Sequence, residues 1–257
     1  METVVETITP DKAMKYLEMN VHNRPVHQKH VEFLVEEIKA GRWKLNGSSI
    51  VFNGDTLIDG QHRLWAVITA GMPIRSIVVR GVDEGAFATI DTGVTRTGGD
   101  VLGIMGEKNP ANLAAAARFI VAYDNKFKSD RKRMANTKVI EIVKKNPGLS
   151  QSVEFIRRSK CKVVSKAIAA GLHYLMSKKD AALANELFEG LAHGFQPESG
   201  ETFLALREKL ISLLSATTYA KGSSIAVFII KAWNAKRDGK YLRVFRHAAG
   251  EEIPKIK

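Results

Sequence analysis

The sequence predicts an α+β protein with two domains, at about residues 1–100 and 101–257. Two observations predict this class. Short β-type runs alternate with helical patterns only before residue 100, and every periodic segment beyond it has helical spacing. At 257 residues, 45% of them hydrophobic, the chain is long enough and apolar enough to form two cores.

The first domain is expected to contain helices and a small sheet. Asn53-Gly54 separates two β-type runs and predicts a hairpin, because both residues tolerate positive φ. Gly71 and Pro73 predict the end of the helix that follows the hairpin. The expected elements are helices over 12–19, 27–41 and 64–68, and strands over 49–52, 56–58 and 74–80.

The second domain is expected to be wholly α-helical. The predicted helices cover 111–123, 137–145, 151–158, 166–176, 181–191, 203–214 and 224–236. The second and third of these, joined by a short turn, have the outline of a helix-turn-helix, although Pro147 in the turn makes the match poor.

The positive charge is concentrated in the second domain. The formal net charge is +12, yet residues 1–100 carry 11 Lys and Arg against 13 Asp and Glu, whereas residues 101–257 carry 28 against 14. A basic surface favours polyanions through counterion release, so DNA is the expected partner. We expect contact with the phosphate backbone rather than base reading, and the alternative is a solvated surface. The candidate residues are Lys126, Lys128, Arg131, Lys132, Arg133, Arg157 and Arg158.

Several protein classes are disfavoured. No apolar run is long enough to span a membrane, and the acidic N-terminus lacks the pattern of a secretory signal, so a cytoplasmic location is expected. Cys161 is the single cysteine, which excludes an intramolecular disulfide and a zinc cluster of cysteines. Its flanking lysines could lower the thiol pKa, but a structural role is favoured.

The segment Asp59-Gly60-Gln61-His62-Arg63 lies between a predicted strand and a predicted helix. Backbone N–H groups and the helix dipole make such a helix N-terminus an anion site. Gly60 would let the backbone approach the anion, Arg63 would grip a phosphate, and His62 would donate a hydrogen bond or transfer a proton. Asp59 would orient His62 or hold a divalent metal. The alternative is a common turn in which Asp59 caps the helix.

This turn resembles the signature of the ParB/sulfiredoxin superfamily. Residues 57–66 match its Gly-x-x-Arg core after a strand, and Asn23-Arg24-Pro25 with the helix up to Gly41 resembles its leading segment. The resemblance covers about residues 8–82. It implies a ParB/sulfiredoxin-like fold for the first domain, with a nucleotide or phosphate site to which Arg24 contributes.

The members of this superfamily differ in activity, and the turn discriminates among them. Sulfiredoxins carry a nucleophilic cysteine where this chain has Gln61 and His62, so sulfinic acid reduction is disfavoured. CTP-binding ParB proteins have an arginine-rich turn, whereas Arg63 is alone here. A free serine kinase has an Asp-Gly-His-His-Arg turn, other members are described as nucleases, and DNA-modification regulators carry a turn identical to this one.

The resemblance and the charge together favour a DNA-associated protein that binds ATP or another nucleotide, with Mg²⁺, and has phosphohydrolase, nuclease or kinase activity. The alternatives are a non-catalytic DNA-binding regulator and a small-molecule kinase that resembles the free serine kinase. A ParB-like head on a basic helical region also resembles proteins of phages and mobile elements. The expected phosphate-binding residues are Arg24, Gly60, Gln61, His62 and Arg63, the catalytic candidates are Glu36, Glu37, Asp59 and His62, and Asp59 is the metal candidate.

Three further features are weaker candidates. A solvated helix face is the favoured interpretation of Glu36 and Glu37 over a role as base or metal ligand, and Glu32 is a poorer candidate on the same helix. The glycine-rich segment 91–100, which includes Arg96, would either close over a ligand or serve as an interdomain linker, and it is not a P-loop. Four histidines lack metal-ligand spacing and are interpreted as surface or packing residues: His27, His30, His173 and His193.

Overall fold

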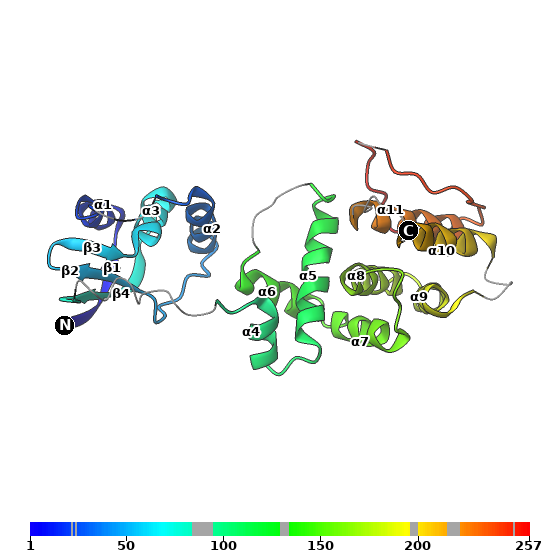
Figure 1. The fold of residues 1–257 in the computed structure, drawn as a ribbon, viewed down its shortest axis with the longest axis horizontal. Coiled ribbons are helices and arrows are strands. Elements are labelled where there is room, and N and C mark those ends of the chain that lie inside the picture. The colour runs from blue at the N-terminus through cyan, green and yellow to red at the C-terminus, as the bar shows by residue number, and fades with distance from the viewer. Residues whose placement is uncertain are drawn as a thin grey trace. The chain divides into compact units, whose positions relative to one another are not determined.

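The computed structural model describes residues 1–21, 23, 25–83, 95–128, 134–195, 200–214, 222–248 and 250–257. In these ranges the protein is α+β and mostly helical, with eleven helices and a four-stranded mixed sheet (Figure 1). The chain divides into two compact units. Unit 1 comprises Met1–Thr95 and Arg131–Ala135, and unit 2 comprises Arg96–Asp130 and Asn136–Lys257.

The sheet of unit 1 has the order β1-β4-β2-β3. Its strands are β1 (Glu2–Ile8), β2 (Ser49–Asn53), β3 (Thr56–Asp59) and β4 (Ile74–Arg80). β1 pairs with β4 and β2 with β3 in antiparallel fashion, whereas β2 and β4 are parallel. The expected hairpin is confirmed, with Gly54 at φ 53° in its turn. β1 was not predicted from the sequence, although its run of Thr, Val and Ile is typical of a strand.

Three helices accompany the sheet in unit 1: α1 (Pro10–Glu18), α2 (Gln28–Lys39) and α3 (Gln61–Ala70). The Thr9 side chain caps α1 by accepting from the Lys12 N–H, and Pro10 takes the first helical position. α3 packs against both other helices, and Figure 1 shows the three on one side of the sheet. Apolar side chains from both layers form the core, among them Ile8, Ile50, Phe52, Leu57, Leu64, Val67 and Val78.

The regular elements of unit 2 in its described residues are all helices, and the seven predicted helices are confirmed; the described residues beyond α11 are irregular. Its elements are α4 (Gly98–Ile104), α5 (Pro110–Asp124), α6 (Asn136–Lys145), α7 (Leu149–Ser159), α8 (Lys166–Ser177), α9 (Ala181–His193), α10 (Glu201–Leu214) and α11 (Gly222–Arg237). No helix in the described part of the chain combines the length and apolarity that a bilayer span requires.

Helix α8 lies at the centre of unit 2, because it packs against α5, α7, α9 and α11. Gly171 in α8 permits the closest of these approaches. A Cβ at this position would lie 2.2 Å from Cδ1 of Phe119 in α5, which no real contact allows. The glycine therefore serves helix packing rather than chain reversal.

Helix α4 was not predicted, because three of its seven residues are glycine, a poor helix former. A capping box starts it: the Thr97 side chain accepts from the Asp100 N–H, and the Asp100 carboxylate accepts from the Thr97 N–H. The last three residues of the glycine-rich segment 91–100 thus form the first turn of a helix. Residues 91–94 lie outside the described ranges.

Candidate functional site

The turn between β3 and α3 is built around Gly60. This residue is the N-cap of α3, at φ 109°, and a Cβ here would lie 3.0 Å from Cγ1 and 3.1 Å from Cα of Ile50. Both the left-handed backbone and the close approach to β2 therefore require glycine. The Gly60 carbonyl accepts from the N–H groups of Arg63 and Leu64, which starts the helix directly after the strand. The expected strand–turn–helix geometry is confirmed, and Asp59 is not the cap.

Arg63 and Asp59 form an ion pair across the first turn of α3. Arg63 Nη2 lies 2.6 Å from Asp59 Oδ2, and the arginine side chain is only 14% exposed. The other terminal nitrogen, Nη1, is buried and has no hydrogen-bond partner among the described residues. A buried charged donor without an acceptor is costly, and native structures rarely keep one without a reason. Among the described atoms of the turn, this nitrogen is the strongest candidate to bind an anionic ligand.

Gln61 is buried, and its side chain faces neighbouring loop residues. Its Oε1 accepts from Asn20 Nδ2 at 3.3 Å, and Asn23 Nδ2 donates to Asn20 Oδ1 and to the Leu57 carbonyl. These amides tie the segment after α1 to the end of β3. Gln61 therefore contributes to the shape of the turn, a role that sequence reasoning missed because the asparagines are distant in the chain. Arg24, expected to reach the phosphates, lies outside the described residues.

His62 is buried among other histidines. Its Nε2 accepts a hydrogen bond of 3.0 Å from the backbone N–H of His27, so a neutral ring carries its proton on Nδ1. The His27 ring is stacked on it at 5.9 Å, and the His30 ring meets it edge-on at 5.3 Å. Sequence spacing did not predict this cluster, because the three residues come together only when α2 packs on α3. In the cluster His62 positions the start of α2.

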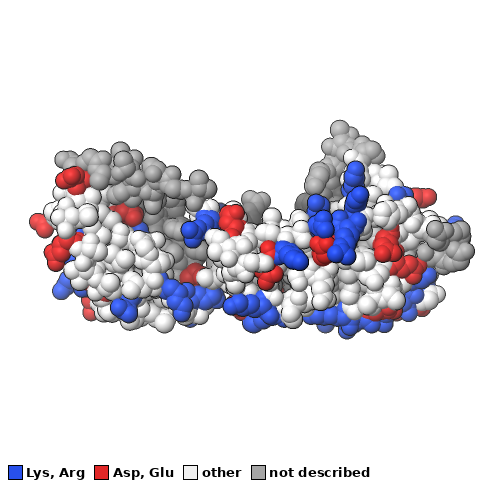
Figure 2. Space-filling model, turned by 90° about the horizontal axis from the view of Figure 1, so that it is seen from below, with Lys and Arg blue, Asp and Glu red and all other residues white. Residues whose placement is uncertain are grey.

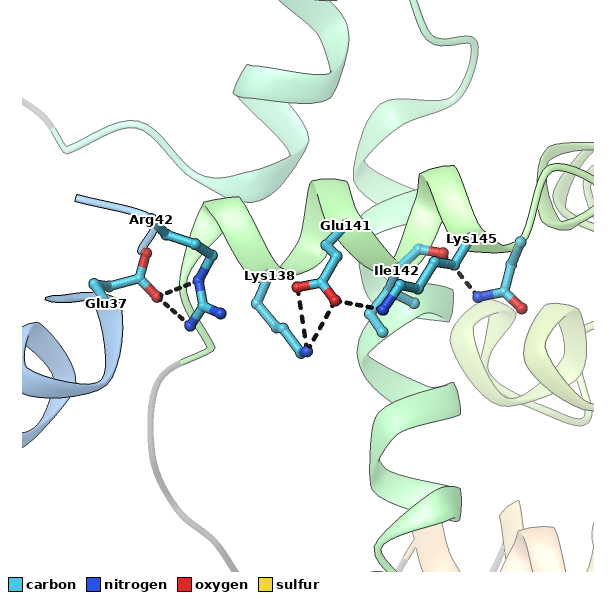
Figure 3. Close-up of polar contacts among 7 residues, drawn as sticks. Glu37, Arg42, Lys138, Glu141, Ile142 and Lys145 are labelled. Atoms are coloured by element: carbon cyan, nitrogen blue, oxygen red, sulfur yellow. Dashed lines mark hydrogen bonds and ion pairs between the residues drawn. The ribbon is translucent and has the colours of Figure 1, made fainter. Parts of the chain in front are cut away.

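The two glutamates on α2 differ in environment. Glu36 is exposed, whereas Glu37 is buried and its Oε1 accepts from Arg42 Nε and Nη2 at 3.0 and 2.7 Å (Figure 3). Two guanidinium nitrogens occupy the same carboxylate oxygen, so this geometry suits an ion pair that closes the end of α2. Neither glutamate is brought to the Asp59–Arg63 pair by a contact among the described residues.

The metal expectation rests on Asp59. Among the described residues, no three His, Cys, Asp or Glu side chains are grouped as a metal site. Mg²⁺ often binds through one carboxylate together with phosphate oxygens. Asp59 could supply this carboxylate, but its Oδ2 would first have to release Arg63. The arginine and a metal ion would therefore compete for the same carboxylate.

The basic residues of unit 2 are partly neutralised by acidic neighbours. Arg157 and Arg158 both bind Glu154, at 2.8 and 2.7 Å, and Lys126 lies 2.9 Å from Glu252. Glu141 likewise binds both Lys138 and Lys145 on α6 (Figure 3). Figure 2 shows lysine and arginine side chains on the surface of unit 2 with acidic side chains among them. Lys128 is exposed, and residues 131–133 lie outside the described ranges.

Two buried groups of unit 2 belong to its packing. Burial raises the pKa of the Cys161 thiol despite the nearby Arg207, which agrees with a structural cysteine. His173 is buried and bonded on both ring nitrogens, to Ser152 Oγ and Asn185 Oδ1 at 2.9 Å each. Its ring is stacked on Phe155 at 4.3 Å. From the sequence, His173 was interpreted as a surface or packing residue. In the structure it lies at the centre of a polar network.

Comparisons of this chain with protein-family models, with curated proteins and with solved structures found no match.

Proposed function

We propose that the protein binds a phosphate-bearing ligand, with a nucleotide as the first candidate, at the turn formed by Asp59, Gly60 and Arg63. The observation that carries this proposal is the buried Arg63 Nη1 at the N-terminus of α3, which lacks a hydrogen-bond partner in the part of the chain that the structure describes. Phosphate oxygens would supply the missing acceptor, and both the guanidinium and the helix dipole favour negative charge there. The likeness of the turn to the ParB/sulfiredoxin signature points to the same ligand class.

Binding at this turn would exchange one partner of Arg63 for another. In the structure, Nη2 of the guanidinium donates to a single oxygen of Asp59. A phosphate that approaches along the axis of α3 would meet both the guanidinium and the first backbone N–H groups. Asp59 would then orient the arginine or bind a Mg²⁺ ion that accompanies the nucleotide.

The geometry supports binding more strongly than it supports catalysis. His62 Nε2 is engaged with the backbone of α2, and Glu37 is held by Arg42. Phosphohydrolase, nuclease or kinase activity would therefore need Asp59 or a group of the substrate to act as the base. We propose nucleotide binding as the function to test first and phosphoryl chemistry as its extension.

A thermal-shift and calorimetric titration with ATP, CTP and GTP, each with and without Mg²⁺, tests the proposal. A ligand at a hundred times its Kd adds about 2.7 kcal/mol to the free energy of unfolding. Arg63→Ala is expected to lose this response. Arg42→Ala is the matched control, because it also removes a guanidinium bound to a carboxylate in unit 1 but should keep the response. Equal responses in both variants would contradict the proposal.

Asp59→Asn separates the two roles of the carboxylate. Without the ion pair, Arg63 is free to bind phosphate, so nucleotide should bind more tightly when Mg²⁺ is absent. A variant that instead loses only the Mg²⁺-dependent part of binding would assign Asp59 to the metal. Unchanged binding in both conditions would remove Asp59 from the site.

Association with DNA is the second candidate function, and the charge excess beyond residue 100 favours it. The backbone of duplex DNA would be bound with a steep salt dependence, since each neutralised phosphate changes the slope of log K against log salt by about 0.9. Anisotropy titrations between 50 and 200 mM salt should give a shallower slope for Lys126→Ala/Lys128→Ala than for the wild type. Nucleotide binding without any DNA binding would instead favour a small-molecule kinase.

A further inference from the structure

Residues 251–257, referred to here as the tail, are held by side chains of α5 and α11. The Tyr123 hydroxyl donates to the Pro254 carbonyl at 3.3 Å and accepts from the Ile256 N–H at 3.0 Å. The Asn234 amide donates to the Lys255 carbonyl at 2.8 Å and accepts from the Lys257 N–H at 3.0 Å. Trp233 Nε1 donates to the Lys257 carbonyl at 3.0 Å.

These five hydrogen bonds bind the main chain of the tail, within only four residues. The side chains of the tail add three ion pairs, Glu251 with Lys231, Glu252 with Lys126 and Lys257 with Asp238, and Ile253 and Ile256 are half-buried. Burial raises the pKa of Tyr123, so its hydroxyl stays protonated and can donate and accept at once. Side chains that satisfy the backbone of a bound segment are the means by which proteins recognise peptides. The groove between Tyr123 and Asn234 therefore has the chemistry of a peptide-binding site.

The chain that precedes the tail has contacts of its own with α10 and α11, and a turn in which the Glu251 N–H donates to the Ala248 carbonyl joins the two. Phe245 is buried and meets the Phe228 ring at 6.2 Å, and the Leu242 N–H donates to Thr202 Oγ1. Gly250, at φ 83°, lies between this anchored stretch and the tail. Six residues of extended chain reach about 20 Å, so the tail can leave its groove while residues 241–248 stay in place.

We propose that the groove between Tyr123 and Asn234 also accepts the tail of a second copy of this chain, so that the protein self-associates by exchanging residues 251–257. A second copy is the occupant that the structure favours, because its tail offers the same main-chain path and the same lysine opposite Asp238. The tethered tail competes at an effective concentration of about millimolar, so exchange in the wild type is weak.

Two variants separate the groove from the tail. Asn234→Ala removes both amide contacts and leaves those of Tyr123 and Trp233, so this variant has a weakened groove and an intact tail. Ile256→Pro removes the N–H that donates to Tyr123, so that variant has a weakened tail and an intact groove. When the two are mixed, the tail of the first should bind the groove of the second. Association in the mixture, measured by anisotropy of the labelled Asn234→Ala protein, is expected to be at least about 100-fold tighter than that of either variant alone.

Substitutions at neighbouring exposed positions give the matched control. A mixture of Asn125→Ala and Lys255→Ala, which leaves all five hydrogen bonds in place, should associate no more tightly than the wild type. Circular dichroism checks that each variant is folded, and Asn234→Asp, which loses only the donor to Lys255, replaces Asn234→Ala should that variant unfold. Folded complementary variants that associate no better in the mixture than alone would overturn the proposal.

Discussion

Glu6 in unit 1 and Glu154 in unit 2 each bind two cationic side chains, and the pKa of each is lowered to about 2. Their partners differ in kind. Glu6 on β1 binds Lys12 of α1 and Arg80 of β4, whereas Glu154 binds Arg157 and Arg158 of its own helix. The same pKa therefore describes two different structural roles. A carboxylate whose cationic partners lie on other elements joins those elements by ion pairs, whereas Glu154 is linked to another element by a neutral hydrogen bond of 2.9 Å from Asn109 Nδ2, at the start of α5.

The physical causes of the two shifts differ in the same way. Burial acts to raise the pKa of Glu6, but hydrogen bonds from Lys12, Tyr16 and Arg80 outweigh it. The pKa of Glu154 is lowered by hydrogen bonds from Arg157 and Arg158 at the surface of α7. The Glu6 side chain is 13% exposed, and that of Glu154 is 30% exposed. Solvent and salt therefore screen the second group far more than the first.

The largest loss of stability is expected in unit 1 at Gly60, where β2 and α3 meet. Gly60→Ala combines a left-handed backbone with a Cβ that would lie 3.0 Å from Ile50 Cγ1, so unit 1 should lose about 2–4 kcal/mol of stability. Gly71→Ala, at φ 66° with no atom within 4 Å of the new Cβ, should cost about 1–2 kcal/mol. Hydrogen exchange resolved by unit gives both values, and equal losses would mean that contact with Ile50 does not matter.

The next effect is expected at Glu6. Glu6→Gln should destabilise unit 1 by about 1–3 kcal/mol at neutral pH, less than the full displacement of the pKa implies because Lys12 and Arg80 are partly solvated. The folded pKa lies below the ordinary 4.5, so this stabilisation is present above pH 4.5 and is lost as pH falls towards 2. Chemical denaturation of wild type and variant across this range checks the prediction.

Glu154→Gln is the matched control for Glu6→Gln, because both variants neutralise a carboxylate with a strongly lowered pKa. We expect a small change that disappears at high salt, since both cationic partners lie at the surface of the same helix and the glutamine keeps an oxygen that can accept from Asn109. A loss in unit 2 as large as that of Glu6→Gln in unit 1 would contradict the distinction between the two carboxylates.

His173 should distinguish the stability of unit 2 from that of unit 1 at a pH closer to neutrality. Burial lowers its pKa below the ordinary 6.5, so the folded state binds the proton less well than the unfolded state does. Unit 2 should therefore lose stability as pH falls below 6.5, whereas the contribution of Glu6 in unit 1 is kept down to pH 4.5.

His173→Gln tests this assignment. The variant should be less stable than the wild type by about 1–3 kcal/mol at pH 7, because buried hydrogen bonds are lost. The difference should narrow as pH falls, since only the wild type must protonate a buried imidazole. Parallel stability curves for the two proteins between pH 7 and 5 would exclude His173 as the source of acid sensitivity.

Local sequence signals predicted most of the helices and the turn of the candidate site. Asn53-Gly54 indicated the hairpin, and helical spacing indicated the seven later helices of unit 2, because these features depend on residues a few positions apart. The turn at Gly60 was predicted for the same reason. β1 was missed because its strand character depends on pairing with β4, and five of its seven residues, Glu2 to Val5 and Thr7, are exposed.

The partners of the site residues could not be predicted, because they come from elsewhere in the chain. His62 meets His27 and His30 across two helices, and Gln61 meets Asn20. Glu37 was selected as a candidate base from its position on α2, but its contact with Arg42 depends on how the chain leaves that helix. Residue type and spacing thus identified the candidate side chains, and only the packing of the chain determined which groups each of them contacts.

The pairing of β1 with β4 also sets the order in which unit 1 can fold. Glu2 is opposite Arg80 and Ile8 is opposite Ile74. β1, which is synthesised before the other strands of its sheet, can therefore pair only after β4, the last of them, has been synthesised. The hairpin of β2 and β3 closes over a few residues and can form early, whereas closing the loop between β1 and β4 costs more entropy. Until β4 is synthesised, β1 is a nascent edge strand without its partner in the described sheet, and the Glu6–Arg80 ion pair forms only when translation of unit 1 is nearly complete.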